Sequence, residues 1–226
     1  MMVPLRNLSS FGLSTDERCR GLMRVLSPKA VVFDLGGVLV EVDSTKALRD
    51  LRAHCTAGAG FTPDLPGTQR LVRAFECGEL ATQGFYEAVC RQEALSVDLE
   101  RFCEAYCDIF SPVEEMIDAH AALRRAGVAT YLFSNTSELH FNRIRERYPF
   151  MAGFAGYFLS YELGCMKPDA RAYVAVEDAT GCRPGELVFI DDRPENVEGA
   201  ARRGWRAIRH THPRLTVAAL KDLGLL

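Results

Sequence analysis

Polar side chains that could bind phosphate and a cation stand at four separated points of this sequence. They are Asp34, Ser134 with Asn135, Lys167, and the adjacent pair Asp191 and Asp192. Asp34 and the acidic pair each follow a short apolar run, as does Ser134, whereas Lys167 precedes a Pro-Asp helix start. Two neighbouring acids at the end of a buried strand repel each other, which favours a cation as their partner. A carboxylate, a hydroxyl, an amine and an acidic pair could together bind a phosphate and a divalent cation.

The apolar runs that precede these residues predict the strands that would position them. The runs cover Ala30 to Phe33, Ala129 to Phe133, Leu187 to Ile190 and, more weakly, Arg206 to Ile208. Segments with helical spacing separate them, and this alternation is typical of an α/β fold with a parallel, Rossmann-like sheet and crossover helices. Ligands of such sheets bind beyond the carboxyl ends of the strands. We therefore expect the polar residues to converge there.

The segment between the first two strands is far longer than a crossover requires, and its pattern is helical. Helices are predicted near residues 44–55, 68–77, 82–93, 97–110 and 112–125. Ser111 is expected to cap the last of these, with Pro112 at its first position and Glu114 completing a capping box, and Gly127 is expected to end it. We predict a loosely ordered extension over 1–27, an α/β core of 28–43 and 111–226, and an inserted helical cap over 44–110.

The composition of the chain indicates which kind of molecule it binds. The chain of 226 residues has a formal net charge of −3, which favours neither nucleic acid nor an anionic membrane. No run approaches the roughly 18 apolar residues of a membrane span. Its eight cysteines follow no secretory signal, so a reducing cytoplasm is expected. A small-molecule partner fits best, and both a monomer and a homodimer stay open.

Four motifs in this order resemble those of the haloacid dehalogenase superfamily. They are Val32 to Leu39 (VFDLGGVL), Leu132 to Thr136 (LFSNT), Gly164 to Asp169 (GCMKPD) and Phe189 to Asn196 (FIDDRPEN). The resemblance runs from about residue 28 to the C-terminus, and the helical insertion matches the cap of part of this superfamily. The wording of the motifs is similar to its sugar-phosphatase branch, including bacterial α-glucose-1-phosphatases.

The resemblance implies a role for each of these residues. Asp34 would attack phosphorus and form an aspartyl-phosphate. Mg²⁺ would be held by Asp34, the Gly36 carbonyl and Asp192, with Asp191 in support. Lys167 and the Ser134 hydroxyl would stabilise the phosphoryl oxygens, and Asn135 would help to orient the substrate. Asn196 is expected to hold its loop together. The implied activity is hydrolysis of a small organic phosphate, such as a sugar phosphate.

The first motif departs from most phosphatases of the superfamily at Gly36. Those enzymes carry there a second aspartate, which protonates the leaving alcohol, and such help typically gives ~10² to 10⁴-fold in rate. The departure predicts a preference for anomeric, acyl or aryl phosphates. Glu41 and Asp43, at the cap hinge, could replace this aspartate as the acid. The commoner interpretation of such residues is that they are solvated at the start of a helix. The cap residues considered for substrate specificity are Arg70, Arg73, Phe75, Glu76 and Phe85, which the sequence does not rank.

Two other functions remain open. A 2-haloacid dehalogenase shares the nucleophile, the Ser-Asn pair and the lysine and needs no metal. That branch usually has an aromatic residue at the position of Gly36 and small polar residues in place of Asp191 and Asp192, which speaks against it. A non-catalytic phosphate-binding module on the same fold is the alternative from a different class.

Overall fold

The computed structural model describes residues 27–55 and 66–226, so the predicted extension over 1–27 lies almost wholly outside the described residues. The strands are β1 (Ala30–Phe33), β2 (Val40–Val42), β3 (Phe110–Pro112), β4 (Ala129–Ser134), β5 (Gly156–Leu159), β6 (Leu187–Asp191) and β7 (Arg206–Arg209). The α-helices are α2 (Ser44–Arg52), α3 (Pro66–Glu76), α4 (Thr82–Glu93), α5 (Leu99–Cys107), α6 (Glu114–Arg125), α7 (Glu138–Arg147), α8 (Ser160–Leu163), α9 (Ala170–Thr180), α10 (Pro194–Arg202) and α11 (Pro213–Asp222). Two 3-10 helices, η1 and η2, cover Pro149–Gly153 and Pro184–Glu186.

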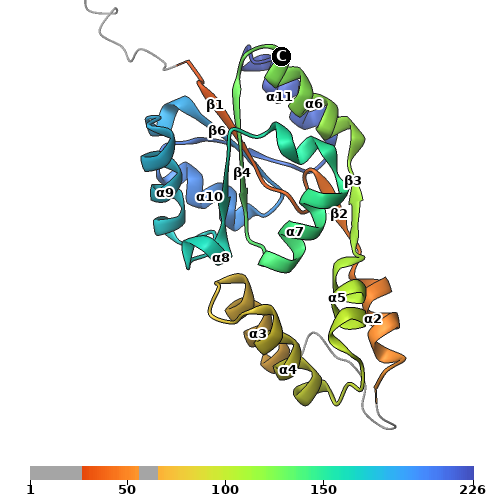
Figure 1. Cartoon of the computed structure of the whole chain (residues 1–226). Helices are drawn as coiled ribbons and strands as arrows, with labels where there is room; N and C mark the ends of the chain where they lie inside the picture. Colours follow the sequence, from red (N-terminus) through yellow and green to blue (C-terminus); the bar gives the residue numbers. More distant parts are fainter. Residues whose placement is uncertain (1–26, 56–65) are drawn as a thin grey trace, which may run out of the picture.

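A five-stranded parallel sheet in the order β5-β4-β1-β6-β7 forms the core, which confirms the predicted fold class. The central strand β1 is buried on both faces because its side chains alternate between two apolar clusters. Val31 and Phe33 pack with residues of α6, α7 and α11, whereas Ala30 and Val32 pack with residues of α9 and α10. The helices lie on both sides of the sheet in Figure 1.

Helices α2 to α5 form the insertion and have an apolar core of their own. Phe75 and Phe85 stack with ring centroids 4.3 Å apart, and Phe102 packs edge-on against Phe85. Figure 1 shows this helical unit beyond one end of the sheet, with the α3–α4 turn directed at α8. We call this helical unit the cap. The boundaries given above for the extension, the core and the cap stay predictions.

A two-stranded antiparallel ribbon, β2 with β3, joins the cap to the core, and the sequence did not predict it. The expected helix start at Ser111 is therefore wrong. Ser111 and Pro112 pair with Glu41 and Val40 in extended conformation, and α6 begins only at Glu114. At its other end α6 stops as expected, because Gly127 adopts a positive φ of 78° just after it.

Two histidines outside the four motifs are buried in contacts with polar and aromatic groups. His120 bonds Thr130 at 3.0 Å and stacks on Phe154, and His140 of α7 bonds the Tyr106 carbonyl of the cap at 3.0 Å. Burial lowers the pKa of each from 6.5 to about 4. Each is thus neutral in the folded protein at a pH where the unfolded chain binds a proton.

We expect the free energy of unfolding to fall as the pH drops below 6.5 toward 4. The loss from each histidine should be roughly 2 kcal/mol between about pH 7 and about pH 5, because one pKa unit is worth about 1.4 kcal/mol. This loss can be measured by urea unfolding at both pH values, with the wild type, His120→Gln and His140→Gln. Each variant should lose less stability on acidification, whereas His212→Gln, at an exposed position, should follow the wild type.

Within the described residues, no helix combines the length and apolar character that crossing a membrane demands. Every cysteine in that part of the chain is a free thiol.

Candidate active site

The four groups of predicted residues meet at the carboxyl ends of the central strands. Asp34 directly follows β1, Ser134 ends β4 and Asp191 ends β6, and all three are buried. Neighbouring strands are paired in parallel register, with Phe33 beside both Leu132 and Ile190. The residues that follow these positions therefore emerge at the same edge of the sheet.

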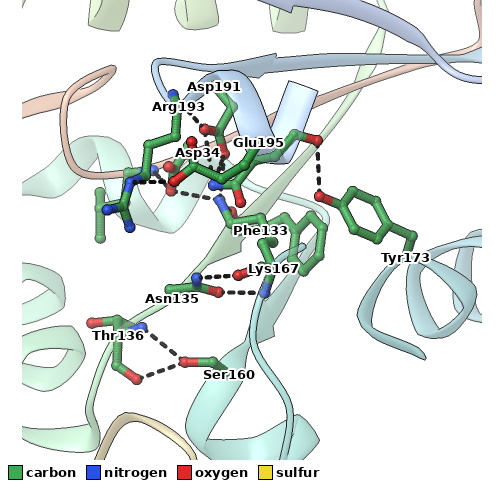
Figure 2. A network of polar contacts seen from close by, with 12 residues as sticks. Asp34, Phe133, Asn135, Thr136, Ser160, Lys167, Tyr173, Asp191, Arg193 and Glu195 are labelled. Carbon is green, nitrogen blue, oxygen red and sulfur yellow. Dashed lines mark hydrogen bonds and ion pairs between the residues drawn. The ribbon is translucent and has the colours of Figure 1, made fainter. Parts of the chain in front are cut away.

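Lys167 is the centre of the site, and its side chain has no exposed surface. Its ammonium group lies 3.0 Å from Asp34 Oδ1 and 2.7 Å from Asp191 Oδ2, and it donates to the Phe133 carbonyl at 2.7 Å. The rings of Phe133 and Phe189 flank it, with centroids 5.1 and 5.3 Å away. Figure 2 shows the resulting network around Lys167. One buried cation thus neutralises part of the charge of two buried carboxylates.

Asn135 positions this lysine. Its amide oxygen accepts from the Lys167 backbone N–H at 2.8 Å, and its amide nitrogen donates to the Lys167 carbonyl at 2.9 Å (Figure 2). The loop after β4 is held in turn by Ser160, whose hydroxyl bonds both the N–H and the carbonyl of Thr136. The hydrogen bonds of Asn135 therefore hold the backbone of Lys167 in place. Contact between Asn135 and the substrate stays a prediction.

The three carboxylates of Asp34, Asp191 and Asp192 could hold a metal ion. One oxygen of each lies within 4.8 Å of the others. Octahedral Mg²⁺ binds oxygens at roughly 2.0 to 2.1 Å, so two of its ligands stand about 2.9 Å apart when adjacent and about 4.2 Å apart when opposite. The three side chains would have to close around the ion to reach these spacings, and their hard oxygen donors suit it.

Electrostatics at the site favour a cation in addition to Lys167. Burial raises the pKa of Asp34 to about 7; the Lys167 charge opposes the shift and the Asp191 charge adds to it. Burial and the charge of Asp191 also raise the pKa of Asp192. A divalent ion would favour the ionised form of these acids.

Asp191 differs from the other two acids because its oxygens are already occupied. They accept from Lys167, from the Arg193 backbone N–H at 2.9 Å and from the Asn196 amide at 3.0 and 3.1 Å. A carboxylate has about four acceptor positions, so Asp191 serves mainly to fix Lys167 and its own loop. Asn196 holds this loop as expected, and its carbonyl accepts from the Tyr173 hydroxyl.

The glycines after Asp34 allow the chain to turn tightly against the acidic pair. Gly37 has a φ of 74°, and a Cβ there would lie 2.6 Å from Asp192 Oδ2, so only glycine fits without displacement. A Cβ on Gly36 would meet only the Val42 side chain, at 3.1 Å. The carbonyl of Gly36 as a metal ligand stays a prediction.

The Ser134 hydroxyl has no partner among the other residues of the site. Within the part of the chain that the structure describes, it forms no hydrogen bond, although Ser134 is buried at the end of β4. A hydroxyl in this state can donate to a ligand oxygen. Sequence reasoning had not singled out Phe133, Phe189 or Ser160, because apolar strand residues and a single serine give no chemical signal.

The two hinge acids lie at a helix start and on an exposed strand. Asp43 caps α2 by accepting from the backbone N–H and hydroxyl of Thr45 at 2.9 and 2.6 Å, and these bonds lower its pKa. Glu41 is exposed on β2. Among the cap candidates, Phe75 and Phe85 lie in the apolar core of the cap, and Arg70 and Arg73 are exposed.

The sequence of this chain is similar to those of known phosphatases. The family described as haloacid dehalogenase-like hydrolase matches residues 28–204. A sesquiterpene phosphatase of Aspergillus oryzae is 26% identical over 86% of this chain and 96% of its own length. D-ribitol-5-phosphate phosphatase of Bacteroides thetaiotaomicron is 26% identical over 75% of this chain and 85% of its own.

The fold is also that of a solved structure, a HAD family enzyme from Bacteroides thetaiotaomicron in complex with magnesium and inorganic phosphate. It superposes with a TM-score of 0.71 at 23% identity, over 81% of this chain and 94% of that one.

Proposed function

Because the chain belongs to the family of haloacid dehalogenase-like hydrolases, we propose that it is a Mg²⁺-dependent phosphatase that forms an aspartyl-phosphate on Asp34. The observation that carries the proposal is the convergence of Lys167 with three acids at one edge of the sheet. The proposed substrate is a small organic phosphate, with sugar phosphates as the first class to test. The resemblance of the motifs and the ribitol-phosphate relative support that class.

In the proposed reaction an Asp34 carboxylate oxygen attacks phosphorus in line, and water then releases the phosphate from Asp34. Lys167 and the Ser134 hydroxyl stabilise the charge on the equatorial oxygens. Asn135 and Asp191 fix the position of Lys167 through hydrogen bonds at 2.7 to 2.9 Å. A Mg²⁺ bound by Asp34 and Asp192, with Asp191 in support, would reduce the repulsion between the nucleophile and the phosphate.

The dehalogenase alternative fits the site less well. Hydrolysis of a 2-haloacid would leave Asp192 beside two other carboxylates with no cationic ligand to share, and the charge of Lys167 is already divided between Asp34 and Asp191. Three acids with one buried cation are better matched to a metal and a phosphate.

Metal removal tests the proposal. Hydrolysis of p-nitrophenyl phosphate and of a panel of sugar phosphates should require Mg²⁺ and fall to background after EDTA. Excess Mg²⁺ should restore it, because the ion offsets the charge of both anions. Halide electrodes should detect no release from 2-chloropropionate. Equal turnover with and without metal, or halide release, would contradict the metal-dependent phosphatase. Metal-dependent ligand binding without turnover would indicate the non-catalytic module.

A further inference from the structure

Glu76 lies at the end of α3, in the turn by which the cap meets the core. Two residues on, the turn approaches α8 so closely that a Cβ on Gly78 would clash with the Tyr161 carbonyl. Cys77 lies near enough to Cys165, two residues before Lys167, for their charges to interact. Figure 1 shows the α3–α4 turn facing α8. Glu76 therefore lies on the side of the cap that faces α8, and α8 leads into the loop that carries Lys167.

The Glu76 carboxyl is close enough to one residue of the catalytic loops, Arg193, for their charges to interact. Arg193, directly after Asp192, acts on it electrostatically, although the two are not in ion-pair contact. In the cap, the charge of Glu76 contributes to raising the pKa of Tyr106 in α5. With Cys77 beside it, these are the titratable and charged groups that act with Glu76.

The carboxyl of Glu76 has no fixed partner. Among residues 27–55 and 66–226, none forms a hydrogen bond or an ion pair with it, although Glu76 is partly buried. Burial raises its pKa from 4.5 to about 7, and Arg193 opposes this shift. A partly buried acid that is protonated near neutral pH can donate a proton to a ligand.

In-line attack by Asp34 requires the leaving oxygen to lie on the far side of phosphorus, which is the side that the cap covers. Resting on the phosphatase function proposed above, we propose that Glu76 is the proton donor to the leaving alcohol, in place of the acid that Gly36 does not supply. The donor thus comes from the cap, and the core supplies the nucleophile.

The proposed reaction has two steps. An Asp34 oxygen forms a bond to phosphorus, the bond from phosphorus to the alkoxy oxygen breaks, and that oxygen takes the proton of Glu76 and leaves as the alcohol. A water molecule then attacks the aspartyl-phosphate from the same side and gives a proton to the Glu76 carboxylate. The bond between Asp34 and phosphorus breaks, its electron pair returns to the Asp34 carboxylate, and phosphate is released.

Glu76→Gln tests this assignment through the leaving group. The variant should lose about 10²-fold in kcat/KM for the alkyl phosphate that the wild type hydrolyses best, because a proton donor typically contributes this much. With p-nitrophenyl phosphate, whose leaving group needs no proton, the loss should be at most about threefold, since kcat/KM reports only the steps up to release of the phenol. Glu79→Gln, exposed in the same turn, is the matched control and should match the wild type on both.

Two further readouts separate a proton donor from a residue that only maintains structure. For alkyl phosphates, wild-type kcat/KM should decline as the pH rises through about 7, and Glu76→Gln should lack this decline. The variant should also release a stoichiometric burst of p-nitrophenolate, because hydrolysis of the aspartyl-phosphate is slowed.

Equal losses on both substrates, or a wild type that hydrolyses aryl but no alkyl phosphates, would overturn the role of Glu76 and leave the phosphatase function intact. A wild type inactive on every phosphate would overturn both.

Discussion

Asp34→Asn should reduce phosphatase activity by a factor on the order of 10³ or more, because an amide oxygen does not replace a carboxylate as nucleophile. The loss should appear in kcat for every substrate, including p-nitrophenyl phosphate, since each passes through attack by the same atom. Steady-state rates at saturating Mg²⁺ measure it. Brief incubation with a phosphate-ester substrate labelled with ³²P, followed by acid quenching, should label the wild-type protein and leave the variant unlabelled.

The variant should remain folded, which separates loss of the nucleophile from loss of structure. Asparagine has the shape of aspartate, and it removes a charge whose burial is unfavourable, as the raised pKa of Asp34 shows. Its melting temperature without metal should therefore equal or exceed that of the wild type at about pH 8. A variant that keeps substantial turnover would show that Asp34 is not the nucleophile.

Lys167→Met should damage both stability and catalysis. The wild-type ammonium group is fully buried between Asp34 and Asp191. Removing one partner of such a cluster leaves uncompensated buried charge, which costs roughly 3 to 5 kcal/mol. Loss of a preorganised cation at the phosphoryl oxygens should lower kcat by about 10² to 10³-fold.

Urea unfolding and steady-state kinetics, each with and without Mg²⁺, measure these two effects. Mg²⁺ should stabilise Lys167→Met more than it stabilises the wild type, because Lys167 then no longer offsets the charge of the acidic cluster. Lys46→Met provides the matched control, since its ion pair with Asp108 lies at the surface and should contribute no more than about 1 kcal/mol. If Lys167→Met matched Lys46→Met in stability and rate, the buried cation would have no such role.

The preference among leaving groups distinguishes two interpretations of Gly36. From the first motif alone, the missing acid predicts a bias toward aryl, acyl and anomeric phosphates. Glu76 is named by the sequence only as one of several cap residues. In the structure the charge of Arg193 acts on it, and no residue in the described part of the chain forms a hydrogen bond or an ion pair with it. If it donates the proton, alkyl phosphates are substrates as well, and the bias appears only after Glu76→Gln.

The sequence by itself determined the central strands and the residues at their ends. Runs such as Ala30 to Phe33 are short, apolar throughout and β-branched at the centre, and this combination is typical of strands buried on both faces. Once parallel strands are recognised, their carboxyl ends must share one edge, so the convergence of Asp34, Ser134 and Asp191 follows from topology. Edge strand β5 was missed because its four residues, half of them only partly buried, carry a weak pattern.

Only the tertiary structure decided which partners each polar residue has. The β2–β3 ribbon replaced the predicted helix start at Ser111, because pairing between segments far apart in sequence overrode a local capping signal. The exchange of backbone bonds between Asn135 and Lys167, and the approach of Glu76 to the core, likewise join residues more than thirty positions apart. Sequence spacing carries local preferences, whereas such contacts depend on how the cap packs against the sheet.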